Sequence, residues 1–187
     1  NQARIVFEIA SAMCATNPKL SGHGKVLRNT IEYKNSFYKA ISAEANTKHG
    51  FNAHAVILDE LHVFPDRDLY DVLKTSTGAR TQPLVIAITT AGHDTSSICF
   101  ELHEYAQKVK EGSIQDDTFL PVIYAADKND DWTQEATWAK ANPGFGTICK
   151  KDYFEQEVKR CQENPRMINT FLRLHLNIWT ASEERWV

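Results

Sequence analysis

The sequence predicts an α/β domain built on a parallel sheet, followed by a mostly helical region. Two apolar runs, 54–58 and 84–88, are predicted to form strands, and the length and β-branched residues of the first suit a strand that is buried on both faces. Helical patterns at 67–77 and 96–111 follow the first and the second run, respectively. Strands that alternate with helices along a chain are typical of a parallel sheet flanked by helices.

The N-terminal segment is predicted to form a helix and a few short strands. Apolar residues recur at helical spacing over residues 3–15, and an Asn-Pro pair at 17–18 ends the pattern. Residues 25–42 are predicted to contain short extended pieces that are joined by a turn at 33–35.

Both predicted helices of the α/β region carry an apolar face and an end signal. Glycines follow them at Gly78 and Gly112, which is a common way for a helix to end. Residues 119–124 are a candidate third strand, although Pro121 weakens it or restricts it to a sheet edge.

A polar stretch at 127–131 divides the chain. We expect residues 1–126 to form the α/β part and residues 127–187 to form a helical subdomain. The helices expected in the second part span 133–141, 151–163 and 166–178.

Composition excludes several classes of protein. A mean hydropathy of −0.42 and the lack of an apolar run near 18 residues exclude a membrane span. The net charge of −3 does not suggest a dedicated DNA-binding module. The four cysteines form no Cys-x-x-Cys pair, which favours a reducing intracellular compartment over a zinc or redox site. Glu-Leu-His occurs at 60–62 and at 101–103, but neither triplet forms the metal-binding pattern His-Glu-x-x-His.

Asp59 and Glu60 lie directly at the carboxyl end of the first predicted strand. In open α/β sheets, ligands bind beyond that end of the strands. Nucleotide hydrolysis needs such a pair, because one carboxylate helps to hold Mg²⁺ through its water shell and the other polarises the attacking water. This chemistry assigns Mg²⁺ to Asp59 and the general base to Glu60. The alternative is a polar strand end without chemical function.

Residues 89–92, Thr-Thr-Ala-Gly, follow the second predicted strand and lead into a helix. A small polar residue in this place, here Thr89 or Thr90, can contact the γ-phosphate or the attacking water and so report hydrolysis. The alternative is an ordinary strand-to-helix turn in which a hydroxyl caps the helix.

A phosphate-binding loop of the form Gly-x-x-x-x-Gly-Lys-Ser/Thr is missing from the sequence. Residues 22–25, Gly-His-Gly-Lys, come near it, but Lys19 replaces the first glycine and Val26 replaces the Ser/Thr that binds Mg²⁺. Either the protein is no such ATPase, or the loop lies upstream of Asn1.

Several stretches together resemble the large subunit of tailed-bacteriophage terminase, the DNA-packaging motor. Each is modest alone, but eight in order along nearly the whole chain are specific. They span residues 2–7, 57–62, 69–75, 78–83, 88–92, 130–132, 138–143 and 175–179.

The resemblance implies a partial P-loop NTPase fold of the RecA-like (ASCE) type, with ATP and Mg²⁺ as cofactors. Asp59 would be the Walker B aspartate, Glu60 the catalytic glutamate, and residues 89–92 the coupling motif, in which Thr90 and Gly92 would contact the nucleotide. The Walker A loop would precede Asn1 and the nuclease domain would begin near or after Trp186-Val187, so we expect the chain alone to be inactive.

Partners also follow from the resemblance. They would be double-stranded DNA, the small terminase subunit, the portal protein and further copies in a homo-oligomeric ring, in the host cytoplasm and encoded by a phage or prophage. Ring motors also use an arginine finger. Arg80 is a weak candidate for it and Lys48 a weaker one.

Two alternatives stay open. Another ASCE ATPase of the helicase or recombinase type shares the Walker B pattern, and a non-catalytic fragment that only assembles with itself or a partner subunit would need no such chemistry. Trp132, Trp138 and Trp179 are expected to anchor the core of the helical subdomain rather than stack on bases.

Overall fold

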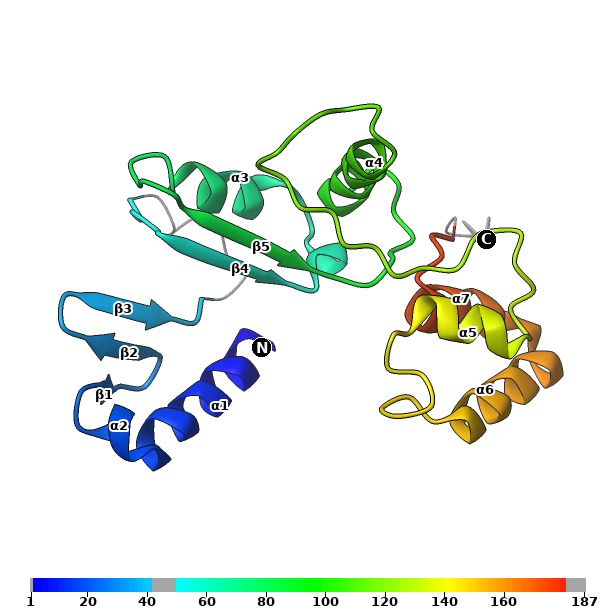
Figure 1. Ribbon diagram of the computed structural model, residues 1–187, viewed down its shortest axis with the longest axis horizontal. Coiled ribbons are helices and arrows are strands. Elements are labelled where there is room, and N and C mark those ends of the chain that lie inside the picture. The colour runs from blue at the N-terminus through cyan, green and yellow to red at the C-terminus, as the bar shows by residue number, and fades with distance from the viewer. Residues whose placement is uncertain (1, 42–49, 181–187) are drawn as a thin grey trace, which may run out of the picture.

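The computed structural model describes residues 2–41 and 50–180 (Figure 1). Lys48, the second candidate for an arginine-finger role, lies outside these residues. Along the described chain an N-terminal helix and antiparallel meander come first, then a unit built on two parallel strands, then a unit of helices. Within residues 2–41 and 50–180, no helix is long and apolar enough to cross a membrane.

The N-terminal part confirms the predicted helix, the short strands and the turn between them. Phe7 of the first helix stacks on Tyr38 of the meander, with their ring centroids 5.9 Å apart. The strands pair antiparallel in the order β1-β2-β3. The elements are α1 (Gln2–Thr16), α2 (Pro18–Ser21), β1 (Lys25–Val26), β2 (Thr30–Tyr33) and β3 (Ser36–Lys39).

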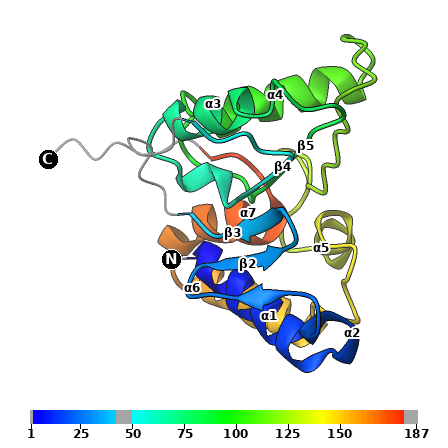
Figure 2. The same cartoon turned by 90° about the vertical axis from the view of Figure 1, so that its left-hand side faces the viewer.

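The sheet unit confirms both predicted strands and their parallel pairing. Strands β4 (Ala55–Asp59) and β5 (Leu84–Ile88) run side by side. Helices α3 (Asp68–Thr75) and α4 (Ile98–Lys110) lie on one side of them (Figure 2). The shared core consists of Val56, Leu58, Leu61, Leu69, Tyr70, Leu73, Ile98 and Cys99.

The prediction that the first of these strands, β4, is buried on both faces is wrong for the described structure. Val56 and Leu58 of β4 face the helices and are buried, whereas Ile57 between them is 59% exposed. Every residue of β5 is exposed. The physical reason for β4 is that the helices cover only one of its faces, and alternate residues of a strand point to opposite faces. No residue of β5 belongs to the core that β4 shares with α3 and α4, so the described elements leave both faces of β5 exposed.

The predicted third strand at 119–124 is also not formed. The segment is extended, with Leu120 85% and Val122 64% exposed, but the structure assigns no strand to it. A strand needs a hydrogen-bonded neighbour, and Pro121 has no backbone N–H to donate. The sequence pattern of a strand is therefore present here without a partner for it.

The helical unit encloses a core of its own, centred on Phe154. The ring of Phe154 contacts the rings of Trp138, Phe145 and Phe171, with centroid distances of 5.4–6.2 Å. The indole N–H of Trp138 donates to the carbonyl of Trp132 at 2.8 Å. The helices are α5 (Glu135–Ala141), α6 (Lys151–Glu163) and α7 (Ile168–Leu176), with a short 3-10 turn η3 (Pro165–Met167) before α7. A second 3-10 turn, η2 (Leu61–Val63), follows β4 in the sheet unit.

The three tryptophans divide between the two cores. Trp132 and Trp138 belong to the helical core, as predicted. Trp179 does not, because it packs against the core of the sheet unit. Its neighbours Leu176 and Ile178 lie in the helical core, so one short segment joins the two cores. The domain division at residues 126 and 127 stays a prediction.

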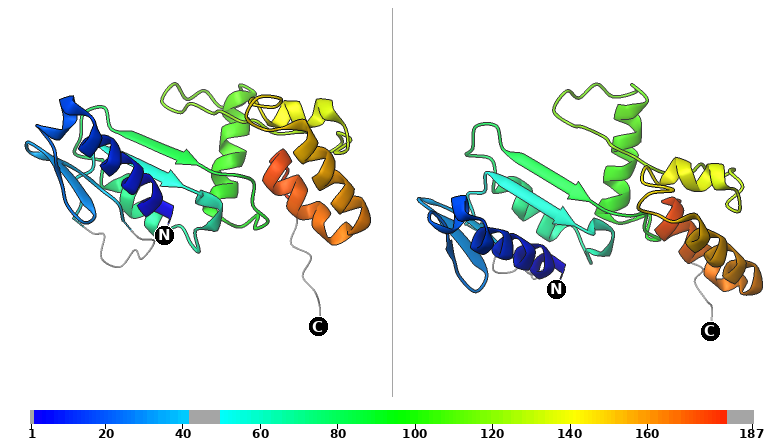
Figure 3. Two further views of the ribbon diagram at one scale, coloured as in Figure 1. Left: turned by 90° about the horizontal axis from the view of Figure 1, so that it is seen from below. Right: turned by 60° about the horizontal axis from the view of Figure 1, so that its bottom comes forward.

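The helical unit lies at the carboxyl end of β4 and β5, the end toward which both arrows point in Figures 1 and 3. Ligand sites of α/β sheets lie at this end. The placement therefore brings the C-terminal segment to the edge that holds the predicted acidic pair.

Candidate functional site

The strand register brings the two predicted site segments together. Asp59, the last residue of β4, is paired with Ile88, the last residue of β5. Glu60 and Thr89 each follow directly and leave the sheet at the same edge. Two carboxylates and two hydroxyls thus lie at the same end of the two strands. Hydrated Mg²⁺ preferentially binds oxygen groups of this kind.

Glu60 has an unusual backbone conformation. Its φ of 54° and ψ of 51° lie in the left-handed region, which costs a side-chain-bearing residue roughly 1–2 kcal/mol. The next residue, Leu61, is only 1% exposed and so fixes the chain in the core. Strained residues of this kind gather at functional sites, where the surrounding structure holds them.

His62 connects Glu60 to the segment after β5. Its ring Nδ1 lies 3.1 Å from Oε2 of Glu60 and 3.0 Å from Oγ1 of Thr89. Its backbone N–H also donates to Oγ1 of Thr89 at 3.0 Å. The hydroxyl of Thr90 lies 3.5 Å from the same ring nitrogen. The sequence does not single out His62 for this role, because its Glu-Leu-His triplet lacks any known metal pattern.

The environment of His62 favours its neutral form. Burial is the main cause that lowers its pKa, and the positive charge of Arg173 and the nearby His93 lower it further. The carboxylate of Glu60 acts in the opposite direction and raises the pKa. A neutral imidazole can either donate or accept at Nδ1, depending on its tautomer.

Residues 89–92, here called the threonine loop, are held by the C-terminal segment. Asn177 accepts a hydrogen bond from the N–H of Ala91 at 3.3 Å through Oδ1 and donates to the carbonyl of Tyr124 at 2.8 Å through Nδ2. Asn177 has a φ of 52°, a conformation that Asn tolerates better than most residues. The loop and the C-terminal segment are therefore fixed to each other.

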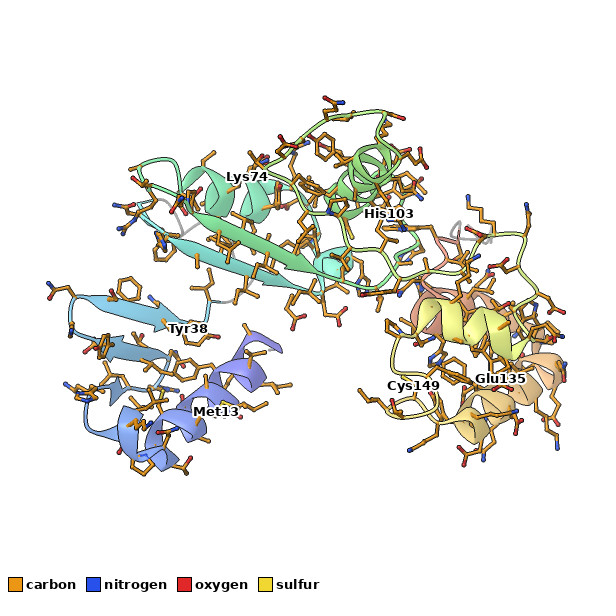
Figure 4. The ribbon with its side chains drawn as sticks, viewed as in Figure 1. Met13, Tyr38, Lys74, His103, Glu135 and Cys149 are labelled. Carbon is orange, nitrogen blue, oxygen red and sulfur yellow. The ribbon has the colours of Figure 1, made fainter. Side chains whose placement is uncertain are left out.

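Gly92 lies against Trp179. A Cβ atom added to Gly92 would lie 2.9 Å from Cζ3 of the indole, closer than real Cβ contacts allow. Phe100 and His103 of α4 pack on the same indole, at 4.9 and 5.6 Å between ring centroids; His103 is labelled in Figure 4. The structure thus gives Gly92 a packing role, and its predicted contact with a nucleotide stays a prediction.

Arg173 of α7 also reaches this edge. Its Nη1 donates to Nδ1 of His93 at 2.9 Å, and its Nε is buried without a hydrogen-bond partner among the described residues. His93 directly follows the threonine loop. No sequence motif marks Arg173, because the contact joins residues that are 80 positions apart.

Arg80 does not belong to this site. Its guanidinium donates to the carbonyl of Asn52 through Nε at 3.1 Å and Nη2 at 2.7 Å. Asn52 precedes β4 and Arg80 precedes β5, so both lie at the amino end of the parallel strands. Arg80 therefore cannot act on the candidate site of its own chain.

The structure excludes residues 22–25 as a phosphate-binding loop. A phosphate loop leads from a strand into a helix. Here α2 precedes Gly22 and β1 begins at Lys25, which is the reverse order. Across residues 2–41 and 50–180, no group of three or more His, Cys, Asp or Glu side chains is arranged to hold a metal ion.

The fold and the site together define a class of protein. Parallel strands that end in an acidic pair and in a threonine loop, with helices alongside, indicate part of an α/β nucleoside-triphosphatase of the P-loop type. The family model of the terminase large subunit ATPase domain matches residues 1–108, and the model of its endonuclease domain matches residues 113–187. The expectation that the nuclease domain begins near or after Trp186-Val187 is therefore wrong, because the match to the nuclease model begins at residue 113. The chain belongs to the terminase large subunit family.

Individual relatives are similar over most of this chain. The chain is 32% identical over 185 residues to the terminase large subunit of Enterobacteria phage HK97, covering 94% of this chain and 35% of that protein. It is 34% identical over 137 residues to protein YmfN of Escherichia coli strain K12, covering 73% and 30%. The crystal structure of the HK97 bacteriophage large terminase matches with a TM-score of 0.82 at 29% identity, over 95% of this chain and 37% of that one. The chain thus spans about a third of the length of these relatives.

Proposed function

We propose that this chain carries the ATP-hydrolysing residues of a motor that packages double-stranded DNA into procapsids. The nuclease part of the intact protein would cleave the DNA. The observation that carries the proposal is the register of β4 and β5. It places Asp59 and Glu60 at the same edge as Thr89 and Thr90, in a chain of the terminase large subunit family. A helicase-type or recombinase-type ATPase would share the site but not this family match.

Each residue takes a separate task in the proposed reaction. Bound Mg²⁺ would offset part of the negative charge of the phosphates. Asp59 would help to hold that ion through its water shell, and Glu60 would accept the proton of the attacking water as general base. Thr89 and Thr90 offer hydroxyls from the neighbouring strand, where they can follow the state of the terminal phosphate. Arg80, at the opposite end of the strands, could serve as an arginine finger only toward a neighbouring subunit.

The partners follow from the packaging function. Contacts to double-stranded DNA would be made mainly to its backbone, since packaging must act on any sequence. The small terminase subunit would deliver DNA and the portal protein would receive the motor, which would act as a homo-oligomeric ring. We place this assembly in the cytoplasm of the bacterial host.

Substitution Glu60→Gln in a full-length protein that carries this chain tests the proposal. The amide keeps the shape of the side chain but cannot accept the proton. We expect ATP binding to be retained and hydrolysis to fall by about 10²–10⁴-fold, the usual contribution of a general base. Binding is measured by titration calorimetry and hydrolysis by phosphate release.

Glu111→Gln is the matched control, because Glu111 is an exposed glutamate at the end of α4, away from the strand ends. This variant should hydrolyse ATP at the same rate as the protein without a substitution. Near-normal hydrolysis by the Glu60 variant would show that Glu60 is not the base.

A further inference from the structure

We propose that His62 is a positioning residue for the reaction: its Nδ1 tethers Glu60 to Thr89, so that any movement of the threonine loop changes the placement of the general base. The inference rests on the proposed function and deepens it. His62 itself touches no reacting atom in this scheme. It acts only through Glu60, Thr89 and Thr90.

The first step of the argument is the number of partners around one atom. Nδ1 of His62 lies 3.1 Å from Oε2 of Glu60, 3.0 Å from Oγ1 of Thr89 and 3.5 Å from Oγ1 of Thr90. An imidazole nitrogen either carries a hydrogen and donates, or lacks it and accepts. An ionised carboxylate can only accept, so Glu60 is held only while Nδ1 carries the hydrogen.

The second step is the hydrogen-bond inventory of Thr89. Its hydroxyl donates to the carbonyl of Thr90 at 2.9 Å, so Oγ1 is left to accept. It accepts from the backbone N–H of His62, and its remaining lone pair is shared between Nδ1 of His62 at 3.0 Å and the weaker thiol donor of Cys99 at 3.7 Å. With the hydrogen on Nδ1, the ring therefore serves Glu60 and Thr89 together, which agrees with the two short distances.

The alternative arrangement releases Glu60. If Nδ1 lacks the hydrogen, it can accept from the hydroxyl of Thr90, and nothing then holds the carboxylate of Glu60 at the ring. The two arrangements exclude each other because they need opposite roles of one nitrogen. The placement of Glu60 is thus linked to which hydroxyl of the threonine loop faces His62.

The third step is that the ring has little freedom to leave. The side chain of His62 is only 15% exposed. A Cβ atom added to Gly92 would lie 3.4 Å from the Cβ of His62. The backbone of the threonine loop therefore packs directly against the side chain of His62. A ring with its hydrogen on Nδ1 therefore fits the two short distances to Glu60 and Thr89.

The test compares three replacements of His62 in a full-length protein that carries this chain. Asn places its amide near the position of Nδ1 and can donate to Glu60. Gln carries its amide farther out, near the position of Nε2, and Ala has no polar group. We expect kcat for ATP hydrolysis to fall by about 10²-fold in His62→Ala and His62→Gln, a typical loss when a catalytic group is misplaced by about 1 Å.

His62→Asn should recover most of kcat, and the KM for ATP should stay nearly unchanged in all three variants. Thermal unfolding is measured in parallel, since a purely structural role would lower stability in proportion to activity. Equal losses of kcat in the Asn and Gln variants, or full activity of His62→Ala, would overturn the inference.

Thr89→Val, alone and combined with His62→Ala, provides the second measurement. Val keeps the shape of Thr without the hydroxyl. If both residues act through one tether, the double variant should lose no more kcat than either single variant, whereas additive losses contradict the tether. The Glu60→Gln variant separates the two proposals: an active Glu60→Gln protein refutes the proposed base, while an inactive one beside a fully active His62→Ala protein refutes only the role of His62.

Discussion

The helical unit surrounds its core on several sides, whereas in the sheet unit one face of β4 is covered and β5 is exposed on both faces. Phe154, at the centre of the helical core, is 2% exposed, and its aromatic neighbours come from α5, α7 and the loop before α6. In the sheet unit, Ile57 is 59% and Ile88 55% exposed on strands of the same apolar character. The two regions bury similar side chains to very different degrees.

The difference shows how an apolar pattern and its burial can separate. Both strands have the sequence of buried strands, but burial depends on elements that pack against each face. Within the described residues, α3 and α4 supply one such layer, and α1 and the meander lie on the other side without covering Ile57 (Figures 1 and 2). The candidate site therefore lies at the carboxyl end of a sheet that is only partly covered, next to a helical unit with a fully packed core.

The largest expected effect is on the helical core. Phe154→Ala should lower the free energy of unfolding by about 3–5 kcal/mol, since it removes a buried ring and leaves a cavity among rigid aromatic neighbours. Urea unfolding of the 187-residue chain, followed by tryptophan fluorescence, measures it.

Ile57→Ala on the open face of the sheet is the counterpart. It should change the free energy of unfolding by only about 0.5 kcal/mol, because its side chain is already exposed. If both variants were equally destabilised, the open face of the sheet would be covered in solution, and the contrast between the two regions would be wrong.

An intermediate effect is expected where the two regions meet. Gly92→Ala should destabilise the chain by about 1–3 kcal/mol, because the new methyl group would overlap Trp179. Gly22→Ala is the matched control, since nothing lies within 4 Å of a Cβ atom there.

Trp179→Leu should relieve the overlap. In the double variant Gly92→Ala, Trp179→Leu, the cost of the alanine should therefore shrink, a non-additivity that thermal unfolding detects. Strictly additive losses would show that the indole does not lie on Gly92, and the link between the threonine loop and the C-terminal segment would have to be abandoned.

Local patterns predict most of the elements, and they predict that the acidic pair and the threonine loop meet at one end of the strands. The β-branched runs at 54–58 and 84–88 form strands, and parallel pairing alone brings residues 59–60 and 89–90 to one edge. Backbone periodicity and the geometry of parallel sheets contain this information. The same reasoning failed at 119–124, because a strand pattern does not specify whether a partner strand lies beside it.

The remaining site residues depend on contacts between distant parts of the chain. His62 meets Thr89 across 27 positions, and Asn177 meets Ala91 across 86. No spacing rule for a single helix or strand covers such distances. Trp179 was assigned to the wrong core for the same reason: its sequence neighbours Leu176 and Ile178 belong to the helical core, but a turn of the chain directs the indole to the sheet unit.

The smallest effect is expected at the surface of the helical unit, where Lys151 of α6 and Glu135 of α5 form an ion pair at 2.6 Å (Figure 4 labels Glu135). Hydrogen bonding to Glu135 raises the pKa of Lys151, yet both side chains are about half exposed and water screens the pair. Lys151→Met should lower Tm by roughly 1–3 °C, and the difference should vanish at about 1 M salt, where the screening length is near 3 Å. A salt-independent loss comparable to that of Phe154→Ala would mean that charges between α5 and α6, rather than the aromatic core, hold the helical unit together.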